Sequence, residues 1–408
     1  MSSTQLHAES EQRGKLPLRA LLALATAAFI TVLTETLPAG VLPAMSSDLD
    51  VSEPAIGQLV TLYALGTAAT AIPLSAVTAG WRRKKLLLTG VVGFAVANTV
   101  TALSTYYPLT MAARFVGGVA AGIVWALLAT YARRMTPEPM QGRAIAIVMA
   151  GIPLALSLGV PAGTFLGELL GWQVTFSVMS VIALALILWI ATTVPDYPGH
   201  ERGGRIPLTR TLAIPGVGAV LFVTLAFVLA HNILYTYIAT FLGHVGLGGS
   251  VSLALLIFGI ASIVSIWIVG AQIDRRLRTL TIAGTLLVAA GATLLAVLAT
   301  SPALVYLAVA LWGLGWGGVP TLLQTAVGDA GGKAGDTALA ILVTLWNVGM
   351  AAGGVVGGVI LDFFGPTAFP WSVLVLLLPV LIAVLAASRH GFPRKTSAPL
   401  EATPEPAK

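Results

Sequence analysis

The chain has 408 residues and no cysteine, with 57% hydrophobic but only 9% charged residues. A soluble domain carries about 25% charged residues, so this composition excludes an ordinary soluble protein and indicates many membrane spans. The absence of cysteine excludes disulfides, thiol catalysis and Cys-ligated metal clusters. The net charge of +6 would suit a nucleic-acid partner, but the placement of the basic residues argues against one.

Twelve continuous apolar stretches follow one another along the chain. Continuous apolarity is typical of membrane helices, whereas the strands of a membrane barrel would alternate. The sequence therefore predicts an all-α integral membrane protein with twelve transmembrane helices. The first stretch is too long for a signal peptide and eleven more follow it, so we expect it to be retained. The predicted helices cover residues 18–44, 55–78, 86–104, 108–132, 143–168, 172–194, 212–243, 250–273, 279–300, 303–328, 337–362 and 367–388.

The basic residues are distributed unevenly among the connections. If both termini are cytoplasmic, 21 of the 22 Lys and Arg residues lie on the cytoplasmic side, and the remaining one, Arg114, lies within a predicted helix. This distribution follows the positive-inside rule. It predicts a multi-pass protein of the cell (inner or plasma) membrane with both termini cytoplasmic, and it explains the positive net charge without nucleic acid.

A long polar stretch divides the chain into two related halves of six predicted helices. Gly163 and Glu168 near the end of the fifth helix are matched, 194 residues later, by Gly357 and Asp362 in the eleventh. Two related halves are typical of a transporter that rocks about a site at their interface. We expect a cytoplasmic tail, a six-helix bundle, a cytoplasmic loop, a second six-helix bundle and a second cytoplasmic tail at 1–17, 18–194, 195–211, 212–388 and 389–408.

Glu35 lies within the first predicted helix, where a charge costs about 2.5–3.5 kcal/mol on insertion scales. Such a residue usually faces a cavity or a partner. Low-dielectric surroundings raise the pKa of a carboxyl group and a nearby cation lowers it, so a carboxyl that alternates between them can bind and release a proton. We expect Glu35 to carry a proton. The alternative is a carboxyl that reaches water or makes a fixed hydrogen bond.

Arg114 is the second intramembrane charge. It lies roughly 9 Å inside the outer end of the fourth predicted helix and Glu35 roughly 13 Å inside its own, so an ion pair between them is possible. The matching position in the second half is Ala310, which favours function over scaffold. The alternative is a purely structural ion pair. Trp125 shares the helix face of Arg114, so this face is a candidate cavity lining.

Further candidates for the substrate cavity lie near the middle of helices in the second half. They are His231, Asn232, Tyr235, Trp316 and Asn347. A histidine can also titrate near neutral pH. The alternative is interhelical hydrogen bonding, which is common for polar residues in membranes and which we favour for Asn347.

Glycines mark two other segments. The fifth predicted helix has them at helical spacing, at Gly151, Gly159, Gly163 and Gly167. Small residues at this spacing let helices approach closely, as simple packing and, compatibly with it, as a hinge-like contact between the halves. Pro153 and Pro161 are expected to bend the helix. Residues 313–318 fit a nucleotide-binding fingerprint, but that motif needs a preceding strand, so we expect no nucleotide.

These features together resemble the major facilitator superfamily over residues 18–388, and within it the bacterial drug:proton antiporters, which include chloramphenicol-resistance and arabinose-efflux permeases. Residues 34–66 are similar to that branch's helix 1–2 signature, RFVGGVAAG at 114–122 to its helix-4 motif, and residues 159–176 to its helix-5 antiporter motif. The resemblance implies the major facilitator fold, proton coupling through Arg114, a helix-5 motif that includes Pro161, outward transport, and a cavity lined by helices 1, 4, 7 and 10.

The loop between helices 2 and 3 departs from the family pattern, which places an aspartate before its arginines. This loop has Arg82 and Arg83 but no aspartate, whereas the equivalent loop of the second half keeps Asp274 and Arg275. We therefore expect Asp274 to carry more of the charge pairing at the inner gate. The alternative is that both loops only anchor the orientation.

The sequence thus predicts an antiporter that exports small lipophilic compounds such as drugs or antibiotics. The proton gradient would be its energy source, with no cofactor, no metal and no enzyme activity. The expected partners are the substrate, protons and the lipid bilayer, with no nucleic acid, and the chain is expected to be a monomer. Sugar efflux is the main alternative, although a sugar usually calls for more polar groups in mid-span. A proton-coupled importer and a non-transporting membrane protein are further alternatives.

Overall fold

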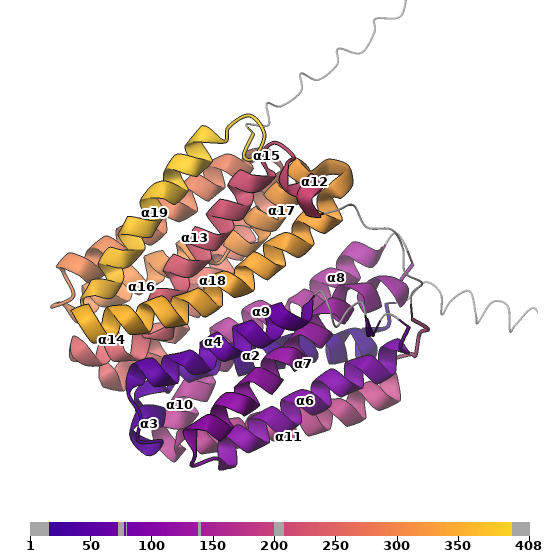
Figure 1. Ribbon diagram of the computed structural model, residues 1–408, viewed down its shortest axis with the longest axis horizontal. Helices are drawn as coiled ribbons and strands as arrows, with labels where there is room; N and C mark the ends of the chain where they lie inside the picture. Colours follow the sequence, from indigo (N-terminus) through magenta and orange to yellow (C-terminus); the bar gives the residue numbers. More distant parts are fainter. Residues whose placement is uncertain (1–15, 72–76, 79, 138–139, 200–207, 394–408) are drawn as a thin grey trace, which may run out of the picture.

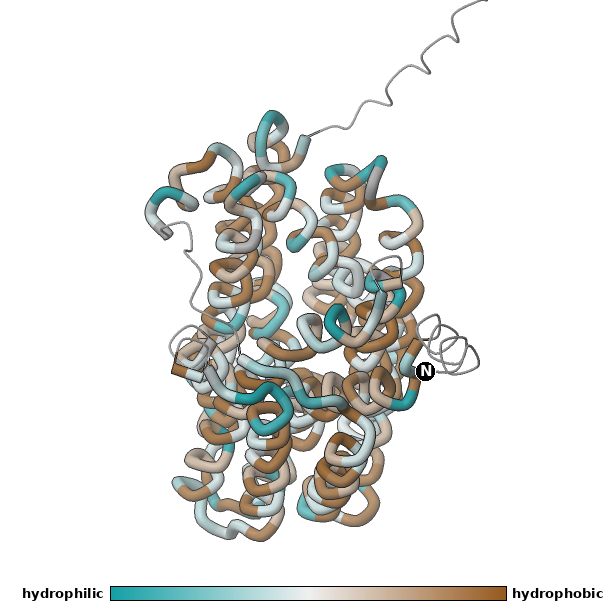
Figure 2. Tube along the Cα trace, turned by 90° about the vertical axis from the view of Figure 1, so that its right-hand side faces the viewer, coloured by the Kyte–Doolittle hydropathy of each residue, from teal (hydrophilic) through white to brown (hydrophobic). Residues whose placement is uncertain are grey.

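The computed structural model describes residues 16–71, 77–78, 80–137, 140–199 and 208–393. Within these ranges the regular secondary structure is helical and contains no strand. The transmembrane helices form two bundles that lie side by side, one from each half of the chain (Figure 1). In the view toward the end where α8 and α12 lie, hydrophilic residues gather in connecting segments, and the helices are mainly hydrophobic (Figure 2).

The first bundle contains six transmembrane helices, of which the fifth is broken. A short helix, α3 (Leu42–Asp48), follows the first of them. The six are α2 (Leu18–Gly40), α4 (Glu53–Ala71), α6 (Arg83–Leu103), α7 (Tyr107–Arg134), the broken helix, and α11 (Trp172–Thr193). The broken helix consists of α8 (Gln141–Met149), α9 (Gly151–Leu154), a π-helical turn (Ala155–Gly159) and α10 (Val160–Leu170).

The second bundle repeats this plan. Its helices are α13 (Val217–Thr236) with α14 (Ile238–His244), two spans within α15 (Val251–Val297), α16 (Pro302–Trp316) with α17 (Val319–Gly331), α18 (Gly335–Phe364) and α19 (Ala368–Ala386). Short helical segments precede or join them: α12 (Leu208–Leu212), Gly248–Ser250 and Gly332–Ala334.

Eleven stretches of the described residues are long and apolar enough to cross a membrane. The remaining helix of the twelve is α4, whose apolar run is diluted by Gln58 and several threonines. Together they give the predicted twelve-helix fold.

The backbone differs from the predicted helices at two places. The eighth and ninth helices were expected to be separated by residues 274–278; they are two helices within α15 that meet at a kink at Arg276 (φ −130°, ψ 25°), so the break is shorter than predicted. The fifth helix is interrupted by the π-helical turn, with Pro153 before it and Pro161 after it. A π-helical turn is a recognised cause of helix bending and is frequent at functional sites.

The two halves also share a backbone feature that the sequence repeat points to. Gly171 ends α10 with φ 90° and Gly365 ends α18 with φ 76°. Only glycine adopts such angles without strain, so each half uses the same device to turn the chain after its fifth helix.

The glycine motif at 313–318 serves helix packing. A Cβ atom on Gly313 would lie 2.4 Å from the carbonyl oxygen of Phe258, and one on Gly317 would lie 2.3 Å from that of Ser262. The junction of α16 and α17 therefore packs directly on the backbone of α15. No strand precedes the motif in the described chain.

Candidate functional site

Arg114 is held by backbone carbonyl groups of two neighbouring helices. Its side chain lies on α7 and is only 1% exposed. One terminal nitrogen donates to the carbonyl oxygen of Thr34 at 2.5 Å and the other to that of Glu35 at 3.2 Å. The Nε–H donates to the carbonyl of Leu59 on α4 at 3.5 Å. The guanidinium therefore ties α2 and α4 to α7.

Pro38 explains why a carbonyl of α2 is available to Arg114. In a regular helix the amide of residue 38 would donate to the carbonyl of residue 34. Proline has no amide hydrogen, and Pro38 lies inside α2. The carbonyl of Thr34 thus lacks its helical donor, and a buried unpaired carbonyl is costly. Arg114 supplies the missing hydrogen bond.

The ion pair considered between Glu35 and Arg114 is not formed. In the described part of the chain no salt bridge joins the two side chains, because the guanidinium is directed at backbone oxygens. The charges are nevertheless close enough to interact electrostatically. Arg114 also lies over the ring of Tyr63, with its central carbon 4.7 Å from the ring centroid. The hydroxyl of Tyr63 donates to the carbonyl of Thr31 at 3.0 Å, so this ring also braces α2.

Glu35 lies where the first bundle meets the second. Its carboxyl group interacts electrostatically with Tyr63 of α4 and with Tyr235 of α13. The hydroxyl of Tyr235 also lies near the hydroxyl of Thr36, next to Glu35 in sequence. Glu35 is only half-buried. A change of charge on this carboxyl would therefore be felt by a residue of the other bundle.

Tyr235 belongs to a compact aromatic cluster in the second bundle. His231 stacks on Trp316 with ring centroids 3.6 Å apart and an angle of 4° between the rings. The indole N–H of Trp312 donates to Nδ1 of His231 at 3.1 Å. Tyr235, one turn further along α13, stacks on His231 with ring centroids 5.2 Å apart. The aromatic cluster consists of His231, Tyr235, Phe258, Trp312 and Trp316.

The structure therefore brings together three of the candidate cavity residues, His231, Tyr235 and Trp316, but not the others. Asn232 and Asn347 each donate to the carbonyl four residues earlier in their own helix, at 2.9 Å, so the interhelical bonding favoured for Asn347 is wrong. Trp125 is partly buried against two hydrophobic clusters, one within the first bundle and one that spans both bundles, and no ring contact with the aromatic cluster is found among the described residues. Trp312 and Phe258 of the aromatic cluster are not conspicuous in the sequence, because they look like ordinary core residues in an apolar span.

The glycines of the fifth helix pack within the first bundle. A Cβ atom on Gly151 would lie 2.1 Å from the carbonyl of Ala25, and Gly159, Gly163 and Gly167 face side chains of Phe29, Leu37 and Val41. These four glycines therefore pack against α2 or the turn after it, and the hypothesis that they form the contact between the halves is wrong for all four. That contact is made nearby, where a Cβ on Gly259 of α15 would lie 2.2 Å from Cα of Ser157 in the π-helical turn.

A second contact between the bundles joins α4 to α18. The amide of Gln58 donates to the carbonyl of Gly354 at 3.3 Å, and the hydroxyl of Thr61 donates to that of Ala351 at 3.0 Å. The hydroxyl of Tyr237 also donates to the carbonyl of Gly354, at 2.8 Å. A Cβ on Gly57 would lie 1.9 Å from that hydroxyl. We call this contact, made by Gly57, Gln58, Thr61, Tyr237, Ala351 and Gly354, the α4–α18 clasp.

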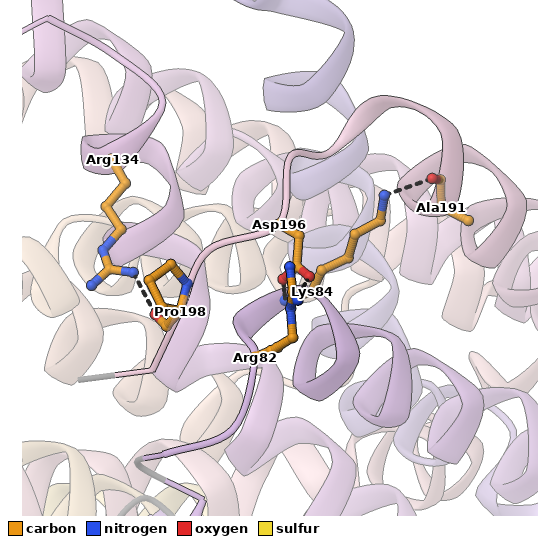
Figure 3. Close-up of polar contacts among 6 residues, drawn as sticks. All are labelled: Arg82, Lys84, Arg134, Ala191, Asp196 and Pro198. Carbon is orange, nitrogen blue, oxygen red and sulfur yellow. Dashed lines mark hydrogen bonds and ion pairs between the residues drawn. The ribbon is translucent and has the colours of Figure 1, made fainter. Parts of the chain in front are cut away.

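The loop between the second and third helices pairs its arginine with a residue that the sequence analysis missed. Arg82 Nε lies 2.5 Å from the carboxylate of Asp196, which also accepts a hydrogen bond from the backbone amide of Lys84 (Figure 3). Asp196 follows α11 and opens the central polar stretch, so the first half supplies its missing aspartate from that segment. The amide of Arg83 donates to the carbonyl of Tyr197 at 2.9 Å.

The segment after α11 lies across the ends of α6 and α7. Arg134 at the end of α7 donates to the carbonyl of Pro198 at 3.0 Å (Figure 3). Burial would raise the pKa of Asp196, but its hydrogen bonds from Lys84 and Arg82 and the charges of these residues together lower it. In the second half Arg275 is exposed, and the side chain of Asp274 lies outside the described part of the structure.

Residues 24–338 match the sequence profile of the Major Facilitator Superfamily. The chain is 31% identical over 389 residues to a chloramphenicol efflux pump of Mycobacterium tuberculosis, covering 92% of this chain and 93% of the pump. It is 30% identical over 381 residues to the transcription regulatory protein OpdE of Pseudomonas aeruginosa, covering 90% of this chain and 93% of that protein.

Solved structures share the fold. The human organic anion transporter MFSD10 (TETRAN) superposes with a TM-score of 0.69 at 18% identity, over 91% of this chain and 100% of the other. A bacterial homologue of the human lysosomal transporter Spinster, in an inward-facing and unoccupied conformation, gives the same TM-score at 14% identity, over 93% and 97% of the two chains.

Proposed function

The chain belongs to the major facilitator superfamily and is a multi-pass membrane transporter, and on that basis we propose that it exports small lipophilic compounds in exchange for protons. The observation that carries the proposal is the position of Glu35. Its carboxyl group lies within the span and interacts electrostatically with Arg114 in its own bundle and with Tyr235 in the other. Gain or loss of a proton there changes the interaction between the bundles.

Proton coupling requires that the proton bind the two conformations with different affinity, because a ligand shifts an equilibrium only by that difference. In the conformation described, the carboxylate of Glu35 interacts favourably with the Arg114 charge and lies close enough to Tyr235 to interact with it electrostatically. Separation of the bundles at this point would move Tyr235 away from the carboxyl group of Glu35. We propose that protonation of Glu35 and binding of substrate favour opposite conformations, and that Arg114 tunes the carboxyl.

The proposed direction of transport and the proposed location in the cell membrane are supported by different observations. The similarity to a chloramphenicol efflux pump along 92% of the chain supports export. The positive-inside distribution supports cytoplasmic termini in the cell membrane, with the polar stretch 195–211 on the same side. With that orientation the α4–α18 clasp closes the outer side, so we propose that the described conformation is inward-facing and that export needs this clasp to open.

The aromatic cluster supports a lipophilic substrate. Its rings offer flat apolar faces, and the polar groups of His231 and Trp312 bond to each other. Tyr235 and Trp316 lie at the border of the cluster, toward Glu35 and toward Trp346 respectively. Sugar recognition normally uses more hydrogen-bonding groups than apolar rings provide, so efflux of an arabinose-type sugar is the weaker proposal.

A proton-flux assay in inverted vesicles tests the proposal. The vesicles are energised, their internal acidity is followed with a pH-quenched dye, and chloramphenicol, a cationic dye and arabinose are added in turn. Vesicles without the protein are the control. We expect chloramphenicol or the cationic dye to dissipate the gradient only when the protein is present. Dissipation by arabinose alone would instead support sugar efflux.

The name of the Pseudomonas relative favours one other candidate, a regulatory membrane protein that does not transport. A protein of that kind needs no intramembrane carboxyl that reaches the other bundle. If none of the three compounds dissipates the gradient while the inserted protein is folded, this candidate and a proton-coupled importer gain support, and uptake of the same compounds into right-side-out vesicles separates the two.

A further inference from the structure

A hollow of about 460 Å³ opens on the first bundle, away from the contact between the bundles. It lies at the beginning of α6, beside the segment that follows α11, and Figure 3 shows two of its residues, Lys84 and Asp196. It is lined by Lys84, Lys85, Leu88, Thr89, Val92 and Asp196. None of these residues takes part in the proposed proton or substrate site, so the hollow needs an explanation of its own.

The mouth of the hollow carries an excess of positive charge. The carboxylate of Asp196 is already paired with Arg82 and bonded to the amide of Lys84, so it offers little repulsion to an anion. The ammonium of Lys84 donates to the carbonyl of Ala191 at 2.6 Å and keeps further donors. Lys85 is exposed, and its ammonium lies 5.7 Å from the centroid of the Trp81 ring.

The rest of the hollow is apolar and continues along the membrane-facing side of α6. Val92 is 44% exposed and Val96 is 51% exposed. Lys85, Val92 and Val96 share one face of the helix. The rise from residue 85 to residue 96 is about 16 Å at 1.5 Å per residue, roughly half of a 30 Å hydrocarbon core. Trp81, which is 44% exposed, is a residue type that gathers at the membrane surface.

A cationic mouth above an apolar track one leaflet long matches the chemistry of a phospholipid. We propose that this hollow binds an anionic phospholipid, with its phosphate between Lys84 and Lys85 and an acyl chain along Leu88, Val92 and Val96. A free phosphate ion would use the lysines but would leave the apolar track without a role. The lipid would also contact the segment after α11 through Asp196 and the Arg82 pair. This proposal does not depend on the direction or substrate of transport.

Native mass spectrometry of the detergent-purified chain tests the proposal. The protein is titrated with phosphatidylglycerol or with phosphatidylcholine of the same acyl chains. Two variants alter the hollow: Lys85→Gln removes a charge, and Thr89→Trp fills the space without changing charge. Arg389→Gln is the control, because Arg389 is an exposed cation just after α19 in the other bundle. Monodispersity and the helical circular dichroism of each variant establish that it is folded.

We expect the tightest site to prefer phosphatidylglycerol, and Lys85→Gln to weaken that lipid about fivefold, the scale of one basic residue at a membrane surface. Thr89→Trp should weaken both lipids at this site, Arg389→Gln should leave both unchanged, and excess inorganic phosphate should displace neither. The proposal would be overturned by equal binding of the two lipids, or by equal losses of lipid affinity in Lys85→Gln and Arg389→Gln. Displacement of the lipid by inorganic phosphate alone would also overturn it.

Discussion

The guanidinium of Arg114 donates to the carbonyl oxygen of Thr34, the group in α2 that Pro38 leaves without a helical partner. A proline in one helix and an arginine in another therefore form a matched pair. The next residue after Thr34 is Glu35, so the pair fixes the backbone that carries the proposed proton site. We propose that Arg114 acts on Glu35 both through this positioning and through its charge.

This relationship predicts that Arg114 and Pro38 are energetically coupled. Arg114→Gln leaves buried carbonyl groups unpaired, at a cost of about 1–3 kcal/mol for each. In a Pro38→Ala background the new amide can bond to Thr34, so the same substitution should cost less. Thermal unfolding of both single variants and of the double variant measures the difference. Pro379→Ala in α19 is the matched control, and strict additivity with Pro38→Ala would contradict the coupling.

Arg114→Lys should preserve the charge but not the function. A single ammonium cannot reach carbonyl groups on two helices in the way that a planar guanidinium does. We expect transport to fall at least tenfold while the protein still inserts and purifies. Transport at the wild-type rate would show that only the charge of Arg114 matters.

The α4–α18 clasp should depend on its glycines. A methyl group on Gly57 would collide with the hydroxyl of Tyr237, so Gly57→Ala should hinder closure. The chain has no cysteine, so the pair Thr61→Cys and Ala351→Cys can report closure by oxidative cross-linking. We expect Gly57→Ala to reduce the cross-link severalfold. Gly328→Ala is the control because its Cβ would meet open space, and equal cross-linking in both variants would contradict the prediction.

The aromatic cluster should contribute to substrate affinity. Trp316→Leu removes the ring stacked on His231, so we expect the KM for an aromatic substrate to rise about tenfold, with a smaller change in kcat. Trp371→Leu is the control, since Trp371 is 52% exposed on α19. A similar KM in both variants would place the substrate elsewhere.

Asp196 should not contribute to the pH dependence of transport near neutral pH. Its lowered pKa means that the pair with Arg82 stabilises the fold above the ordinary aspartate pKa of about 3.9 and is lost only as the pH falls through the lowered value. Asp196→Asn should speed amide exchange at residues 194–198 but leave the pH profile of transport between about pH 5 and 8 unchanged. A shifted profile would assign proton coupling to this end of the bundle as well.

Much of the fold follows from apolar run length and glycine position. The twelve helices could be predicted because each is a long apolar stretch, and the repeat of Gly171 and Gly365 reflects the same chain turn in each half. The shortness of the break at Arg276 could not, because a segment with arginines at 275, 276 and 278 resembles a loop when these residues only mark the membrane surface. The site was predictable only in part. Glu35 and Arg114 are conspicuous as charges, but their geometry depends on Pro38, whose missing amide matters only when the fold brings Arg114 to it.

The most direct test of the central claim compares exchange with net efflux in Glu35→Gln. Proteoliposomes are loaded with substrate, and equilibrium exchange of labelled substrate is measured without a proton gradient, followed by uphill transport with one. We predict that Glu35→Gln keeps exchange and loses uphill transport, while Asp50→Asn, altered at an exposed carboxyl just after α3, keeps both. Uphill transport by Glu35→Gln at the wild-type rate would show that Glu35 does not carry the coupled proton.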